Sequence, residues 1–320
     1  YIKRLLDEAE DPISLLFEPV SESSLQIFEK SRHEDAFKSQ NEAVKWYLKG
    51  LNESGLCLMD NLKRHPNPLT QLRLFNFFCI FHLVRYMALL EAFYCGENIR
   101  PVLLDFSGIA PSQSSVARAS EMAYTQMHKS INRFYAWGYA QKLKEKDYSK
   151  EDLLQSETPV YDEKKKASVE FSTLWNLAKE RASACATDDA ARLVFGETMY
   201  DMLALEASSH PVNCLKILGT SAGMLYPPDQ MHPNKRFVLS QDILEMILRS
   251  TVSPDEVLSG NDMRNRLWER FGIIIGGSTY EIEKLQSSGM LLQIDEDSLE
   301  RNFTSFAALL ESMDFAEVMA

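Results

Sequence analysis

The stretch that decides the fold runs from Leu69 to Tyr94, and its sequence is LTQLRLFNFFCIFHLVRYMALLEAFY. Large apolar residues recur in it at alternating three- and four-residue steps, which predicts a long helix. Because the helix is apolar on nearly every side, it belongs in the centre of a folded protein. Its charged residues, among them Arg73, Arg85 and Glu91, would each cost about 2.5–3.5 kcal/mol near the middle of a membrane. We therefore expect a buried core helix and no membrane partner.

Helical periodicity continues on both sides of this stretch, and Pro101–Phe106 is the one clear strand-like run before the C-terminal residues. The fold class predicted is therefore mainly α. The other predicted helices cover residues 1–10, 23–42, 41–51, 115–146, 167–184, 188–208 and 212–218.

Breaks in the pattern suggest how the chain is divided. Residues 146–166 are rich in charge and lack apolar periodicity, so they are linker-like. Proline-rich stretches near residues 227 and 233 form a second break. We expect a multi-helix N-terminal domain over residues 1–225 and a separate C-terminal domain over 235–320. Because the chain begins at Tyr1, we also expect it to be a stretch of a longer protein.

The C-terminal residues carry clear helix boundaries. Ser240 can cap a first helix, a second ends at Gly272, a third spans residues 280–288, and a strand is predicted at 290–294. This order resembles winged-helix domains, and the resemblance covers about a quarter of the chain. The helix in the recognition position carries Glu281 and Glu283, and the wing position, residues 295–297, is acidic. The resemblance therefore implies a winged-helix-like protein-interaction module more than a DNA-binding one.

Charge is distributed unevenly along the chain, whose net charge is −12. Residues 63–145 contain 10 basic and 5 acidic residues, whereas residues 237–320 contain 6 basic and 15 acidic residues. Arg118, Lys129 and Arg133 fall near one stripe of the helix predicted over residues 115–146. We predict that these three residues bind an acidic partner surface or a nucleic-acid backbone.

Motifs for catalysis or metal binding are not recognisable. No two of the six histidines lie three or four residues apart, and the five cysteines include no CxxC pair, so neither a metal site nor a disulfide framework is predicted. Reduced cysteines favour a cytoplasmic protein, and the Asn302-Phe303-Thr304 sequon is then a chance match. The loop that follows Asp105 resembles an active-site loop, but a capping loop that fixes the turn from strand to helix is the favoured interpretation.

These patterns favour a non-enzymatic scaffold or adaptor subunit of a larger protein complex, without cofactors. By analogy of fold alone, such complexes include those that process nucleic acid and bacterial antiviral defence systems. One alternative is a direct DNA- or RNA-binding protein that uses the basic 63–145 segment. A second alternative is an enzyme with its site at the Asp105 loop.

Overall fold

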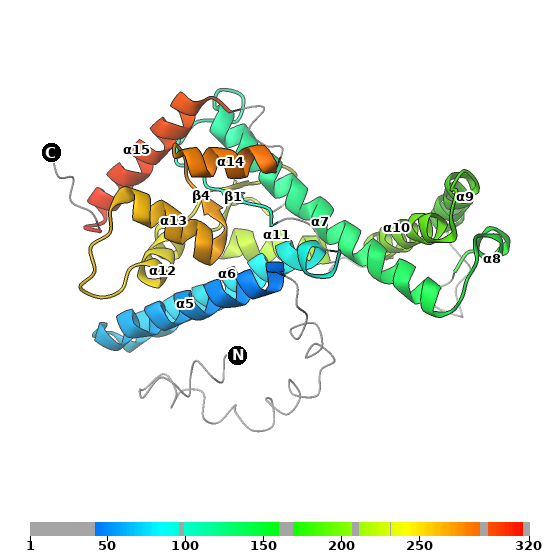
Figure 1. Ribbon diagram of the computed structural model, residues 1–320, viewed down its shortest axis with the longest axis horizontal. Helices are drawn as coiled ribbons and strands as arrows, with labels where there is room; N and C mark the ends of the chain where they lie inside the picture. Colours follow the sequence, from blue (N-terminus) through cyan, green and yellow to red (C-terminus); the bar gives the residue numbers. More distant parts are fainter. Residues whose placement is uncertain are drawn as a thin grey trace, which may run out of the picture. The chain divides into compact units, whose positions relative to one another are not determined.

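The computed structural model describes residues 42–95, 99–159, 169–206, 211–230, 232–288 and 294–315, and these are mainly α-helical, as predicted (Figure 1). The chain forms two compact units. Unit one combines residues up to Met127 with those from Lys216 onward, and unit two runs from His128 to Leu215. The boundary predicted between residues 225 and 235 therefore falls inside unit one. The helices predicted at 1–10 and 23–42 lie outside the described residues.

Unit one consists of helices with two short two-stranded sheets. Its elements are α5 (Glu42–Arg64), α6 (Pro68–Cys95), β1 (Val102–Leu103), the first part of α7 (Ser115–Glu145), the end of α11 (Pro211–Ser221), β2 (Leu225–Tyr226), β3 (Arg236–Phe237), α12 (Gln241–Thr251), α13 (Gly260–Phe271), β4 (Ile273–Ile274), α14 (Thr279–Ser287) and α15 (Glu296–Ser312).

Helix α5 continues well beyond residue 51, where the predicted helix ended. The sequence Asn52-Glu53-Ser54-Gly55 has the composition of a break, but these residues continue the helix. Ser54 is buried, and its hydroxyl donates to the carbonyl of Gly50 at 2.6 Å. A Cβ atom at Gly50 would lie 2.4 Å from the carbonyl oxygen of Arg270. The small residues of α5 therefore mark its close contact with α13, not the end of a helix.

Helix α6 occupies the core of unit one. It is the one helix in the described ranges that is long and apolar enough to cross a membrane, and 61% of its most apolar window is buried inside the structure. Helices α5 and α12 pack against it. This burial is that of a core helix in a soluble protein, as the sequence predicts, and location in the cytoplasm stays a prediction.

The short strands connect parts of unit one that are far apart in the sequence. Strand β1 pairs in parallel with β4, with Val102 opposite Ile273, and β2 pairs antiparallel with β3. The side chain of Asn302 on α15 accepts a hydrogen bond from the Phe106 N–H at 2.8 Å and donates to the carbonyls of Leu104 and Ile275. The asparagine of the sequon is thus a buried structural residue.

The C-terminal helices follow the predicted order. Ser240 caps α12, and Gly272 ends α13 in a left-handed conformation with φ of 65°. Strand β4, however, pairs with β1, and most of the strand predicted at 290–294 lies outside the described residues. Residues 295–297 are the N-cap and first turn of α15, so their interpretation as a wing was wrong. The acidic residues there complement the positive end of that helix.

Unit two is a small helical bundle. It contains the second part of α7, then α8 (Lys150–Gln155), α9 (Val169–Ser183), α10 (Asp188–Glu206) and the start of α11. Helix α8 lies in the stretch expected to be linker-like, where Ser149 and Asp152 form a capping box. The core residues of this unit are Leu153, Phe171, Trp175, Phe195 and Met202 with several alanines. A Cβ atom at Gly196 would lie 2.2 Å from the carbonyl oxygen of Ala136, so α10 and α7 are in close contact.

Candidate partner-binding groove

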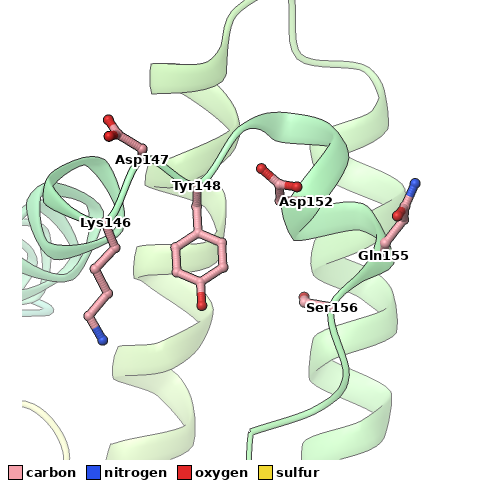
Figure 2. A pocket seen from close by; sticks show the side chains of 6 residues that line it. All are labelled: Lys146, Asp147, Tyr148, Asp152, Gln155 and Ser156. Carbon is pink, nitrogen blue, oxygen red and sulfur yellow. The ribbon is translucent and has the colours of Figure 1, made fainter.

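A groove lies in unit two where α7, α8, α9 and α10 meet. Its volume is about 640 Å³, and a second hollow with some of the same lining residues adjoins it (Figure 2). Its lining residues are Tyr139, Lys142, Leu143, Glu145, Lys146, Tyr148, Leu153, Ser156, Glu157, Pro159, Trp175 and Met199. We call the groove that is lined by these residues the α7 groove.

Local capping interactions hold the loop between α7 and α8 in place. Asp147 has a positive φ of 54° and turns the chain directly after α7. The Nε atom of Arg192 on α10 donates to the carbonyl of Tyr148 at 2.7 Å. The ammonium group of Lys150 donates to the carbonyls of Ser183 and Cys185 at the end of α9, where a cation is favoured. The position of Tyr148 at the groove is therefore fixed from two helices.

The floor of the α7 groove is apolar. Leu153 and Trp175 are 2% and 4% exposed, and the Trp175 ring meets the Phe195 ring at a steep angle with centroids 4.8 Å apart. The Nε1 atom of Trp175 is buried and has no hydrogen-bond partner in the described part of the chain. A buried donor without an acceptor is unfavourable.

Charged and phenolic groups form the rim. Lys142 and Lys146 are exposed and one helical turn apart, and the Lys142 ammonium lies 5.8 Å from the centre of the Tyr139 ring. Lys146 and Tyr148 extend in the same direction, whereas Asp147 points the opposite way (Figure 2). Burial raises the pKa of Tyr139 above its usual value of 10, so its hydroxyl stays protonated and can donate a hydrogen bond.

Acidic residues line both the α7 groove and the adjoining hollow, and Asp152 belongs to the adjoining hollow. The Ser149 hydroxyl and backbone N–H hold the pKa of Asp152 below its usual value. Glu145 and Glu157 complete the acidic part of the lining. The groove thus offers an apolar floor with both signs of charge around it, which suits a peptide segment better than a highly charged polymer.

The three residues predicted to bind a partner are all exposed on α7. Arg118 lies in unit one, and Lys129 and Arg133 lie one turn apart in unit two. Next to Arg133, the rings of Phe134 and Trp137 stack at 28° with centroids 6.4 Å apart. The α7 groove was not predicted from the sequence. The signal that could have indicated it is the pair Lys142 and Lys146 at four-residue spacing, which follows Tyr139.

Other basic residues of the 63–145 segment are occupied within the fold. Arg73 pairs with Asp242 at 3.0 Å, and the Arg100 guanidinium lies 3.4 Å from Glu91. Arg85 is buried against the end of α13, where a Cβ atom at Gly272 would lie 2.6 Å from its Nη2 atom. The negative end of the α13 dipole favours a cation at this place. Fewer basic residues of this segment therefore contribute positive charge to the surface than the sequence contains.

The Asp105 loop is closed by its own contacts. The side chain of Asp105 is fully buried, and its Oδ2 atom lies 3.2 Å from the Nε atom of Arg236. Its Oδ1 atom accepts hydrogen bonds from the backbone N–H and the hydroxyl of Ser107. Arg236 also donates to the carbonyl of Ile109 at 2.7 Å. A substrate would have to displace this ion pair to reach the carboxylate, so the contacts support a structural role.

Residues suited to metal binding are scattered. No group of three or more His, Cys, Asp or Glu side chains that could hold a metal ion occurs in the described ranges, where Cys57, Cys79, Cys185 and Cys214 are free thiols.

Comparisons of the chain with protein-family models, with curated proteins and with solved structures find no match.

Proposed function

We propose that the protein is a non-enzymatic adaptor subunit of a multi-protein assembly and that it binds an acidic segment of a partner protein along α7. The observation that carries this proposal is the surface of α7 in unit two, where exposed Arg133 precedes the Phe134–Trp137 pair and exposed Lys129 lies one turn before Arg133. Arginine and aromatic side chains that lie next to each other are typical of protein interfaces. The α7 groove lies farther along the same helix and in the same unit.

A protein partner is favoured over nucleic acid because several basic residues are occupied within the fold. Nucleic-acid binding depends mainly on several cations that contact phosphates together. In this protein Arg73, Arg85 and Arg100 are paired or buried within unit one. The chain as a whole carries a net charge of −12, which repels a polyanion at long range.

We further propose that α12, α13 and α14 form a winged-helix-like module that contacts proteins. Support comes from α14, the helix in the recognition position. Glu281 is buried and accepts hydrogen bonds from the backbone N–H groups of Ile275 and Gly276. The single basic residue of α14, Lys284, lies over the rings of Trp268 and Tyr280 at 5.2 and 5.1 Å. The helix therefore offers little positive charge to a DNA groove.

The test is a comparison of partners that co-purify with two variants of the protein from its native cells. Arg118→Glu with Arg133→Glu reverses two exposed charges of α7, and Lys45→Glu with Lys49→Glu makes the same charge change on α5 as a control. Both pairs should leave the free energy of unfolding within about 0.5 kcal/mol of the wild type, because these side chains are exposed. We expect partners identified by mass spectrometry to be lost only from the α7 variant.

Nuclease treatment before purification separates the two kinds of partner. A partner that binds through an acidic protein surface should remain bound after nuclease treatment and should be partly released at raised salt. It should also be absent from the purified α7 variant. Retention of every partner by the α7 variant would refute the proposal. A gel shift with a generic duplex that the α7 variant abolishes would favour the nucleic-acid alternative instead.

A further inference from the structure

Two lysines on the α7 edge of the α7 groove keep their charge unpaired. Lys142 and Lys146 line the groove one helical turn apart, and both are exposed. Among the residues that the structure describes, neither ammonium has a carboxylate partner, whereas Lys144 between them pairs with Asp189 at 3.2 Å. Glu145 is the acidic residue that α7 adds to this lining, so the two lysines leave the edge with a net positive charge. This edge therefore attracts an anionic group of a ligand.

The opposite edge of the groove carries negative charge. Figure 2 shows Lys146 on the α7 side and Ser156 at the end of α8, with Tyr148 between them, so the two helices supply the two edges. Glu157 follows Ser156, lines the groove and is exposed. Like charges that face each other across an interface are unfavourable, so Glu157 repels an acidic group on this side. The two edges together favour a ligand that is acidic on one side only.

The floor between the edges suits a large apolar side chain. Leu153 and Trp175 are nearly fully buried, and Pro159 and Met199 complete the apolar part of the lining. The groove volume of about 640 Å³ lies within the range of sites that enclose small ligands. A few buried anchor side chains supply most of the affinity at protein interfaces. The groove therefore asks for an apolar anchor and one neighbouring acidic group.

We propose that the α7 groove binds an extended segment of a partner protein in which a large apolar residue adjoins a single acidic residue. The apolar side chain packs on the floor beside Trp175, and the carboxylate binds Lys142 and Lys146. This inference rests on the proposed function, because it specifies the chemistry of the partner segment that α7 binds. It adds that a segment with acidic residues on both sides of the anchor is rejected by Glu157.

The experiment selects peptides that bind the full chain from a random library displayed on phage. We expect the enriched peptides to share an apolar residue next to one acidic residue, and a fluorescent copy of one such peptide should bind more weakly at raised salt. Lys142→Glu with Lys146→Glu should lower its affinity by roughly tenfold or more. Lys45→Glu with Lys49→Glu, the control on α5, should leave the affinity unchanged. Enrichment of basic sequences, of polyacidic sequences or of none would overturn the proposal.

Two further variants test the second edge and the floor. Glu157→Lys replaces the repelling charge, so the selected peptide should bind several-fold more tightly and polyacidic peptides should now bind as well. Ser156→Phe places a ring in the groove and should abolish binding, while circular dichroism and thermal unfolding show that unit two keeps its fold. Unchanged affinity in both variants would show that the peptide binds elsewhere on the protein.

The outcomes distinguish this inference from the proposed function. Loss of native partners from the Arg118→Glu, Arg133→Glu variant, together with peptide binding that does not depend on Lys142 and Lys146, would refute the groove proposal and leave the adaptor role intact. Retention of every native partner by both pairs of α7 variants would refute the two proposals together.

Discussion

The two units of the protein differ in what their interiors contain. Every buried charged residue in the described chain lies in unit one, including Arg85, Glu91, Asp105 and Glu281. The buried polar residues of unit two are Ser130 and Thr198, and the rest of its core is apolar. Buried polar groups need particular partners, whereas an apolar core needs mainly the correct volume. The stability of unit one should therefore depend on individual hydrogen bonds, and the stability of unit two on close packing.

The largest effect is expected from Asn302→Ala in unit one. This change removes three side-chain hydrogen bonds and leaves buried groups of Leu104 and Ile275 without partners. Because each unsatisfied buried group is costly, the free energy of unfolding should fall by about 3 kcal/mol. Hydrogen exchange should show faster opening of unit one and little change in α9 and α10. Equal loss of protection in both units would contradict the comparison.

A packing change should have the next largest effect, and it should act in unit two. In Gly196→Ala the new methyl group meets the Ala136 carbonyl oxygen 2.2 Å away, so α10 must move from α7. We expect a loss of about 2 kcal/mol, typical of overpacking. Gly138→Ala is the matched control, because a Cβ atom there meets nothing within 4 Å, and it should stabilise α7 by up to about 1 kcal/mol. Urea unfolding measures both, and two equal effects would refute the packing argument.

The pH dependence of unit one should come next. Burial, with a smaller contribution from neighbouring Arg85, lowers the pKa of His82 from 6.5 to about 3. Between these values only the unfolded chain binds the proton, so stability is complete above pH 6.5 and falls as the pH is lowered. The slope from this one group approaches 1.4 kcal/mol per pH unit. His82→Gln should remove that slope in urea titrations at pH 7, 6 and 5, and an unchanged slope would assign it to other groups.

The smallest effect is expected at the surface of unit two. Arg181 and Glu197 form a hydrogen-bonded ion pair at 2.7 Å, and their side chains are 50% and 41% exposed. Exposed pairs of this kind contribute little because water and salt screen them. Arg181→Gln should change the free energy of unfolding by less than about 0.5 kcal/mol in thermal melts. A loss of several times that value would mean that charge matters to unit two as much as it does to unit one.

Local patterns in the sequence predicted the elements but not their partners. Helices α6, α7, α9 and α10 and the caps at Ser240 and Gly272 follow from periodicity and capping residues, and the structure confirms them. The second half of α5 was missed because Ser54 and Gly55 have the composition of a break. The small residues of this helix are explained by its close contact with α13, where the carbonyl of Arg270 lies against Gly50. The pairing of β1 with β4 was not predictable, because two-residue strands have no periodicity of their own.

The candidate site shows the same limit. Exposure of Arg118, Lys129 and Arg133 follows from their place on the polar side of α7. The α7 groove depends on Trp175 and Met199, which arrive from other helices and have the pattern of ordinary core residues in the sequence. Asn302 gave a glycosylation signal, while its role depends on backbone groups far away in the chain.

The pairing of β1 with β4 has a consequence for how the protein is made. Ribosomes synthesise α5, α6 and β1 first, then all of unit two, and only afterwards α12, α13, β4 and Asn302. Unit two therefore has its complete sequence while unit one still lacks the helices that cover α5 and α6. We expect nascent chains that end before residue 240 to bind chaperones through the uncovered α5–α6 hairpin. Ribosome profiling of chaperone-bound chains should show that association cease once residues beyond about 310 have emerged.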